Sequence, residues 1–192
     1  MDSFSIHLKG KPEEEIQVGP LLASDALRQL KTRGLDRVVA VKIDGESRDL
    51  SSQVGSQAEL EPIYLDSDEG LEILRHSTSH VMAMAVKELF PGVKVTIGPA
   101  IQDGFYYDFD YERTFKEEDL PVIEEKMKEI IKANIPFTRR EVASREAVDF
   151  FKDQNEDYKV ELINDLDTEM VSFYTQGSFT DLCRGPHIPS TG

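Results

Sequence analysis

Two pairs of side chains contain most of the residues in this chain that could activate water or bind a metal. His76 and His80 are four residues apart in an apolar-periodic segment, so we expect both imidazoles on one helix face, about one turn apart. Cys183 and His187 enclose the residues 184–186, whose glycine and proline break a helix and favour a tight loop. Such a loop can bring a thiol and an imidazole to the histidine helix, which suits acid-base chemistry or metal binding.

The histidine pair alone would carry little weight, because histidines at helical spacing are usually accidental or part of a packed polar seam. The second pair changes the interpretation. Asp181, Cys183, Arg184 and His187 fall within seven positions, which is unusually rich in reactive side chains. We therefore interpret the two pairs together as one functional site.

Composition limits the class of protein. The chain has 192 residues and is 39% hydrophobic, enough for one large or two small domains with apolar cores. The single cysteine excludes an intramolecular disulfide. Residues 1–7 contain neither a basic stretch nor an apolar run, so we expect no signal peptide, no membrane span and a cytoplasmic location.

The net charge of −15 is opposite in sign to the basic surface of a typical nucleic-acid-binding protein, so the chain should not bind a duplex backbone strongly by itself. Of the 37 acidic residues, 26 follow Leu65, so the acidity lies mainly in the second part. For most of these carboxylates we expect a solvated, solubilising surface.

The first part of the chain alternates short apolar runs with turn-forming residues. The expected elements are strands 4–8 and 15–18, a helix capped by Ser24 or Asp25 and ended by Gly34, and strands 38–43 and 59–64. A turn at 44–45 and a junction at 66–70 complete this part. The order predicts a small β-grasp, ubiquitin-like domain at residues 1–65.

Residues 66–192 predict a larger α+β domain. The expected elements are the histidine helix 72–90, strands and turns at 96–99 and 104–110, helix 117–134, helix 145–152, and a strand 173–181 that leads into the cysteine loop. The helix expected at 117–134 has one apolar face, which consists of Leu120, Ile123, Met127, Ile130 and Ile131.

Five motifs occur in one order along the chain: residues 69–77, Ile97-Gly98-Pro99, residues 104–108, Tyr158-Lys159-Val160 and residues 181–187. In their order and spacing the chain resembles, along nearly its whole length, the amino-terminal part of bacterial-type, class II threonyl-tRNA synthetases. The resemblance implies that residues 1–65 form a TGS module, a β-grasp unit. It implies that residues 66–192 form the editing domain that is related to that of alanyl-tRNA synthetases.

The activity that this resemblance implies is hydrolysis of the ester in mischarged seryl-tRNA(Thr). Serine lacks one methyl group of threonine, and a methyl is worth only about 1–3 kcal/mol of discrimination, so a second sieve is needed. The implied partners are the acylated 3′ end of tRNA(Thr), the serine moiety and the remainder of the synthetase, with no membrane. ATP-dependent ligation of threonine would belong to the full-length protein, and we expect neither threonine activation nor ATP binding from this chain alone.

The resemblance also implies catalytic roles. Water is the expected nucleophile, with His76 as its general base or as partner of the terminal ribose hydroxyl, and with His80 and His187 positioning water and substrate. Lys159 would face the substrate or the developing oxyanion, although the residues alone favour an exposed lysine on a helix. Cys183 beside a histidine has the form of a covalent nucleophile, but an activated ester needs no acyl-enzyme, so we favour direct hydrolysis.

Three further residues are expected to bind substrate. Asp181 would hold the serine ammonium or orient a histidine, and Tyr107 with Gly98 would shape the pocket. For the aromatic side chains the simpler interpretation is core packing.

The metal question has two answers. Zinc at His76, His80, Cys183 and His187 would follow the alanyl relatives, but structural zinc sites favour two or more cysteines, and four protein ligands leave no open position for water. We expect no metal here, and zinc and ATP only in the absent catalytic core.

A synthetase would continue beyond residues 189–192, so we expect a fragment truncated near the end of its editing domain, with a natural standalone protein as the alternative. Two rival functions remain open: a zinc-dependent deacylase of the alanyl type, and a non-catalytic TGS-type binding module. The selectivity for serine over threonine, the contacts of the first domain and the oligomeric state are not determined by the sequence.

Overall fold

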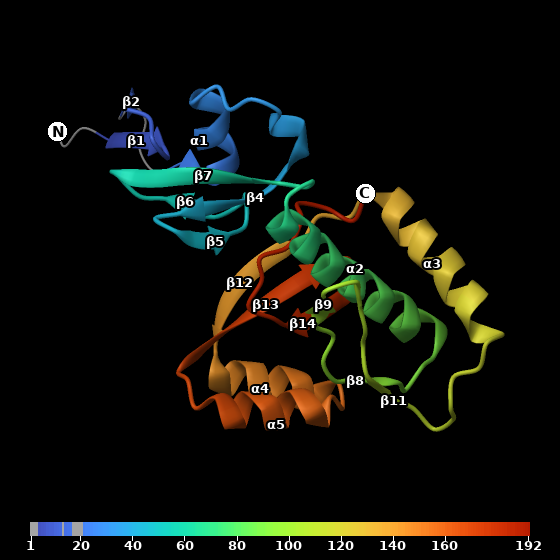
Figure 1. Cartoon of the computed structure of the whole chain (residues 1–192). Coiled ribbons are helices and arrows are strands. Elements are labelled where there is room, and N and C mark those ends of the chain that lie inside the picture. The colour runs from blue at the N-terminus through green and yellow to red at the C-terminus, as the bar shows by residue number, and fades with distance from the viewer. Residues whose placement is uncertain (1–3, 13, 17–20) are drawn as a thin grey trace. The chain divides into compact units, whose positions relative to one another are not determined.

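The computed structural model describes residues 4–12, 14–16 and 21–192, and the fold is α+β, as predicted (Figure 1). The chain divides into two compact units: Met1–Leu74 with Gly185–Pro189, and Arg75–Arg184 with Ser190–Gly192. The division falls inside the helix α2 (Asp68–Leu89). The domains predicted at 1–65 and 66–192 stay predictions.

A mixed five-stranded sheet forms the first unit. Its order is β2 (Glu14–Ile16), β1 (Phe4–Leu8), β7 (Ala58–Tyr64), β4 (Val38–Ile43) and β5 (Glu46–Arg48), with β1 and β7 parallel and the other neighbours antiparallel. The helix α1 (Ala23–Gln29), the short η1 (Leu35–Arg37) and the pair β3 (Leu21–Leu22) and β6 (Gln53–Val54) complete it. Ile6, Leu27, Val41 and Leu60 are fully buried in its core. Of the strand predicted at 15–18, Gln17 and Val18 lie outside the described residues.

Both predicted ends of α1 were wrong. The helix begins at Ala23, so neither Ser24 nor Asp25 caps it, and the backbone N–H groups of Ala23 and Ser24 donate to the carbonyls of Ser52 and Leu50 instead. Backbone carbonyls of a neighbouring segment therefore act as the hydrogen-bond acceptors that a capping side chain would otherwise provide.

The helix also ends at Gln29, five residues before Gly34. Lys31 adopts a left-handed conformation (φ 52°), and the N–H groups of Lys31 and Thr32 donate back to carbonyls of the last turn. This is a Schellman motif, in which a glycine is usual at the Lys31 position. Gly34, also left-handed, precedes η1 instead.

A three-stranded antiparallel sheet, in the order β12 (Thr138–Ala143), β13 (Met170–Gln176), β14 (Phe179–Leu182), organises the second unit. The helices α4 (Ser144–Asp153) and α5 (Asp157–Leu166) lie side by side against one face of it (Figure 1). Their shared core contains Phe151, Ile163 and Phe173. The other elements are α3 (Asp119–Ala133), β8 (Lys94–Val95) paired with β11 (Phe109–Asp110), and β9 (Ala100–Ile101) paired with β10 (Gly104–Phe105).

The histidine helix begins at Asp68, four residues before the predicted start, so residues 68–70 of the predicted junction are helical. The reason is a side-chain cap: the Ser67 hydroxyl accepts the backbone N–H of Gly70 at 3.0 Å. No side chain could replace this glycine without a shift, because a Cβ there would lie 2.0 Å from the carbonyl oxygen of Tyr64.

Two further expectations need correction. Residues 96–99 are a loop, and the strand predicted at 173–181 is a hairpin that turns at Gly177, which is left-handed (φ 55°). The apolar face of α3 is only partly buried, since Leu120 and Ile131 are exposed. Among the described residues, none of the helices combines the length and apolar character that a membrane crossing requires.

Candidate functional site

The periodicities of α2 and β14 bring the site together. Side chains alternate along a strand, so Phe179, Asp181 and the following Cys183 project to the same side of β14. His76 and His80 share one face of α2. Four helical residues rise about 6 Å and two strand residues about 6.6 Å, so the two spacings match. His80 therefore lies near Phe179 and Asp181, and His76 lies near Cys183.

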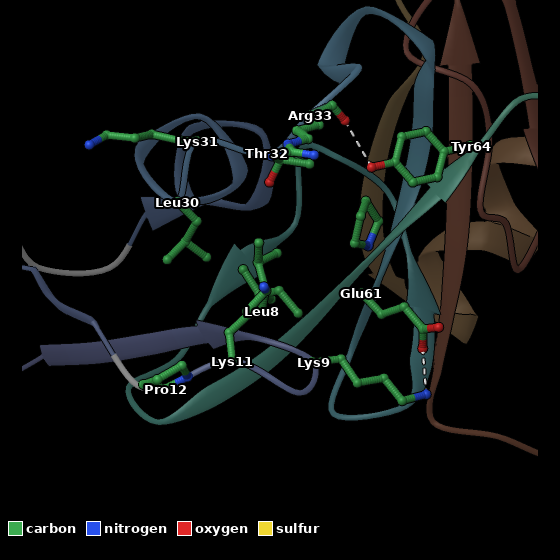
Figure 2. A pocket seen from close by; sticks show the side chains of 12 residues that line it. Leu8, Lys9, Lys11, Pro12, Leu30, Lys31, Thr32, Arg33, Glu61 and Tyr64 are labelled. Atoms are coloured by element: carbon green, nitrogen blue, oxygen red, sulfur yellow. Dashed lines mark hydrogen bonds and ion pairs between the residues drawn. The ribbon is translucent and has the colours of Figure 1, made fainter.

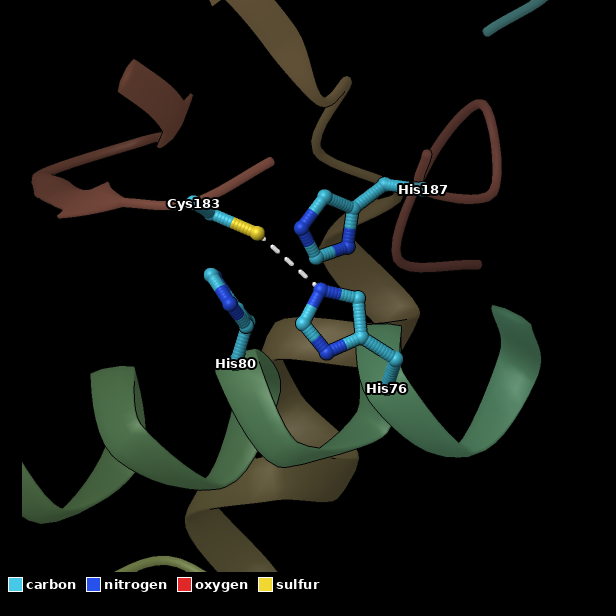
Figure 3. Close-up of side chains that lie close together, drawn as sticks. All are labelled: His76, His80, Cys183 and His187. Atoms are coloured by element: carbon cyan, nitrogen blue, oxygen red, sulfur yellow. Dashed lines mark hydrogen bonds between the residues drawn. The ribbon is translucent and has the colours of Figure 1, made fainter. Parts of the chain in front are cut away.

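A direct contact joins the first histidine to the thiol. His76 Nε2 is 3.0 Å from Cys183 Sγ, and both residues are partly buried (Figure 3). The His76 and His80 rings lie edge to face with centroids 5.0 Å apart, but His80 is only 3% exposed. Two histidines that are equivalent in the sequence thus have different access to solvent.

A buried polar network lies next to His80. The Asp181 carboxylate is 2.6 Å from Lys159 Nζ on α5, accepts a 2.5 Å hydrogen bond from the Tyr107 hydroxyl, and lies 4.0 Å from His80 Nε2. Asp181 also accepts the backbone N–H of Leu182. The exposed lysine that the residues alone favoured is therefore wrong for Lys159, which is 2% exposed because Asp181 compensates its charge.

The network fixes protonation states. Burial raises the pKa of Asp181, but the charge of Lys159 and hydrogen bonds outweigh burial and hold this pKa below its usual value. Burial, then the Asp181 charge, raises the pKa of Tyr107 well above its usual value. Burial lowers the pKa of His80 to about 3, against the opposing effect of Asp181. At neutral pH, Asp181 is ionised and His80 is uncharged.

Gly98 and Tyr107 are in contact, and their role in shaping a substrate pocket stays a prediction. A Cβ on Gly98 would lie 2.1 Å from Tyr107 Cδ2, so only glycine lets the ring lie against this loop. The buried Ser79 hydroxyl lies 2.7 Å from the carbonyl oxygen of His76 and 2.9 Å from that of Gly98. Ser79 thus connects the histidine helix to the loop.

The sequence analysis missed Ser79 and Gln176. The fully buried Gln176 on β13 donates from Nε2 to the carbonyl oxygen of His80 at 2.9 Å, which fixes this turn of α2 to the sheet. Ser79 could have been found, because it follows His76 by three residues on the helix. Gln176 lies directly opposite Phe179 in a hairpin that the sequence analysis did not predict, so no local signal marked it.

His187 belongs to the short segment that groups with the first unit, where its backbone N–H donates to the Asp49 carboxylate at 2.9 Å. One ligand atom from each of His76, His80, Cys183 and His187 lies within 4.8 Å of the others (Figure 3). Three imidazoles and a thiolate are a donor set that fits zinc.

Comparison with known proteins identifies relatives of the chain. A family model described as "Threonyl and Alanyl tRNA synthetase second additional domain" matches residues 171–192. The threonine-tRNA ligase of Pelobacter propionicus is 50% identical over 191 residues, covering 100% of this chain and 30% of that protein. That of Maridesulfovibrio salexigens is 51% identical over 181 residues (94% and 28%), and that of Geobacter sp. strain M21 is 57% identical over 153 residues (80% and 24%).

The chain spans less than a third of the length of these relatives. The match at 171–192 covers the β13–β14 hairpin, Cys183 and His187. The chain is thus homologous to a part of threonine-tRNA ligases, with its cysteine loop inside the match to the second additional domain.

Proposed function

We propose that the second unit hydrolyses the ester of seryl-tRNA(Thr), as the proofreading part of a threonine-tRNA ligase. The observation that carries the proposal is the His76–Cys183 contact beside the buried Asp181–Lys159 pair, in a chain about 50% identical to such ligases. The acylated 3′ end of tRNA(Thr) is the proposed substrate. The remainder of the synthetase, which would ligate threonine with ATP, is the proposed partner.

His76 is the proposed general base. His80, with a pKa of about 3, is too weak a base at neutral pH and instead orients water or substrate through hydrogen bonds. Water attacks the ester carbonyl, the new C–O bond forms, and the bond to the ribose oxygen breaks. The proton that His76 takes from water goes to that ribose oxygen, which releases serine and tRNA with a free hydroxyl. Cys183 orients His76 through their 3.0 Å contact.

The buried network supports substrate selection. Asp181 is the anionic group at this end of the site and is the proposed partner of the ammonium of the aminoacyl group. Lys159 and Tyr107 hold its carboxylate in place, so we propose that they act as positioning residues. The place for the serine hydroxymethyl must exclude one additional methyl group for threonine to be spared.

Deacylation assays with seryl-tRNA(Thr) and threonyl-tRNA(Thr) test the proposal. We expect selective serine release that a chelator does not affect and that His76→Ala slows by about 10²-fold or more, the usual contribution of a general base. His7→Ala is the matched control, because this fourth histidine lies on β1 of the first unit. An unchanged rate in His76→Ala would contradict the mechanism.

A zinc-dependent deacylase of the alanyl type is the second candidate, and the four-residue donor set favours it. If zinc is bound, those residues would hold it, and it would supply Lewis-acid activation of water. Stoichiometric zinc, together with loss of activity on chelation, would support this alternative over the metal-free reaction.

For the first unit we propose a TGS-type β-grasp domain. The sheet order β2-β1-β7-β4-β5, with its parallel central pair and one helix, supports this assignment. A purely binding role for the whole chain is the remaining rival, and absence of any deacylation by the wild-type chain would favour it.

A further inference from the structure

The first unit contains a cavity of about 690 Å³ between the end of α1, the β1–β2 turn and β7 (Figure 2). Its apolar lining comes from Leu8, Pro12, Leu30, Leu60 and Pro62. The Tyr64 ring forms part of the wall, and its hydroxyl donates to the Arg33 carbonyl at 2.9 Å. Every lining residue of the cavity belongs to the first unit, and none is a residue of the proposed deacylase site.

Cations gather around this cavity. Lys9 pairs with Glu61, the one carboxylate of the lining, at 2.9 Å. Lys11, Lys31 and Arg33 have no acidic partner among the residues that the structure describes, and Lys31 extends outward at the rim (Figure 2). The other cations of the unit all form ion pairs: Arg28, Arg37, Lys42 and Arg48. Within a chain of net charge −15, the three cations of this unit that have no acidic partner among the described residues thus all line one cavity.

Two local features at the cavity are costly for the fold. Lys31 occupies the left-handed position that usually belongs to glycine, at a cost that its Cβ imposes. The Thr32 hydroxyl is buried and has no hydrogen-bond partner among the described residues. A ligand acceptor at the cavity wall would satisfy this hydroxyl and would use the Lys31 charge.

We propose that this cavity binds a small phosphate monoester with an apolar or planar body. Phosphate oxygens accept several charge-assisted hydrogen bonds, which Lys11, Lys31 and Arg33 can donate. The apolar lining accepts the body, and the volume lies in the range of small-molecule sites. The acidic chain offers three unpaired cations here rather than an extended basic stripe, which favours a small ligand over a nucleic-acid backbone.

Titration of the ¹⁵N-labelled chain, followed by NMR, tests the site with adenosine monophosphate, adenosine and inorganic phosphate as probes. We expect the monophosphate to shift the amide signals of Lys31, Thr32 and Tyr64 saturably, with a Kd below about 1 mM, and each smaller probe to bind at least about tenfold more weakly. Adenosine binding as tightly as the monophosphate would overturn the phosphate assignment.

Variants complete the test. Lys31→Gly removes one cation from a position that suits glycine, so the fold should be retained while affinity falls about tenfold. Lys152→Gln, which removes an exposed unpaired cation of the second unit, is the control and should bind as the wild type. Unchanged affinity in a Lys11→Gln/Lys31→Gly double variant would overturn the proposal. The proposal would also be overturned if a short single-stranded RNA, at equal phosphate concentration, bound this cavity more tightly than adenosine monophosphate does.

Discussion

Replacing His80 with glutamine should remove a specific part of the acid sensitivity of the fold. Below about pH 6.5 the unfolded chain protonates this histidine, whereas the folded chain keeps it neutral until its pKa of about 3. Protons therefore bind the unfolded state preferentially, so the His80 contribution to stability is complete above about pH 6.5 and is lost as the pH falls. One pH unit corresponds to about 1.4 kcal/mol, so lowering the pH from about 6.5 to 5.0 should cost roughly 2 kcal/mol.

Urea unfolding followed by far-UV circular dichroism, at pH values from about 7.5 to 5.0, measures this difference. His80→Gln should be less stable at neutral pH but should lose roughly 2 kcal/mol less than the wild type over the acidic range. His7→Gln is the control and should lose as much unfolding free energy as the wild type over the same acidic range. An imidazole NMR titration that gives His80 a pKa near its ordinary value would refute the reasoning, because burial would then not keep it neutral.

Two further predictions concern the network around Tyr107. Gly98→Ala would place a Cβ 2.1 Å from this ring, displace it and weaken its hydrogen bond to Asp181, so ester hydrolysis should slow at least about tenfold. Gly104→Ala, where no heavy atom lies within 4 Å of the new Cβ, should retain the wild-type rate, and equal rates in both variants would count against the reasoning. Lys159→Met should lower the unfolding free energy by about 3–5 kcal/mol, because it leaves Asp181 buried and unpaired. Urea unfolding measures this loss, and a companion Asp181→Asn change should restore part of it.

The elements of the site were predictable where periodicity decides them. The helix spacing of His76 and His80 and the loop at Cys183 follow from local rules, and both appear in the structure. The burial of Lys159 was not predictable, because it depends on Asp181, which lies 22 positions away on another element. The predicted start of α1 was also wrong because of residues distant in the sequence. The backbone carbonyls of Leu50 and Ser52 accept the hydrogen bonds that a capping side chain was expected to accept.

The buried ion pair explains how one helix can present two histidines with different chemistry. An apolar pair of similar volume would give comparable stability, so stability alone does not account for Lys159 and Asp181 in the interior. Burial lowers the pKa of His80 more than the neighbouring Asp181 charge raises it, which leaves His80 uncharged. His76, one turn earlier and partly exposed beside Cys183, is the histidine that we propose as the general base. The different surroundings of the two histidines thus follow from what packs against each of them, not from their spacing.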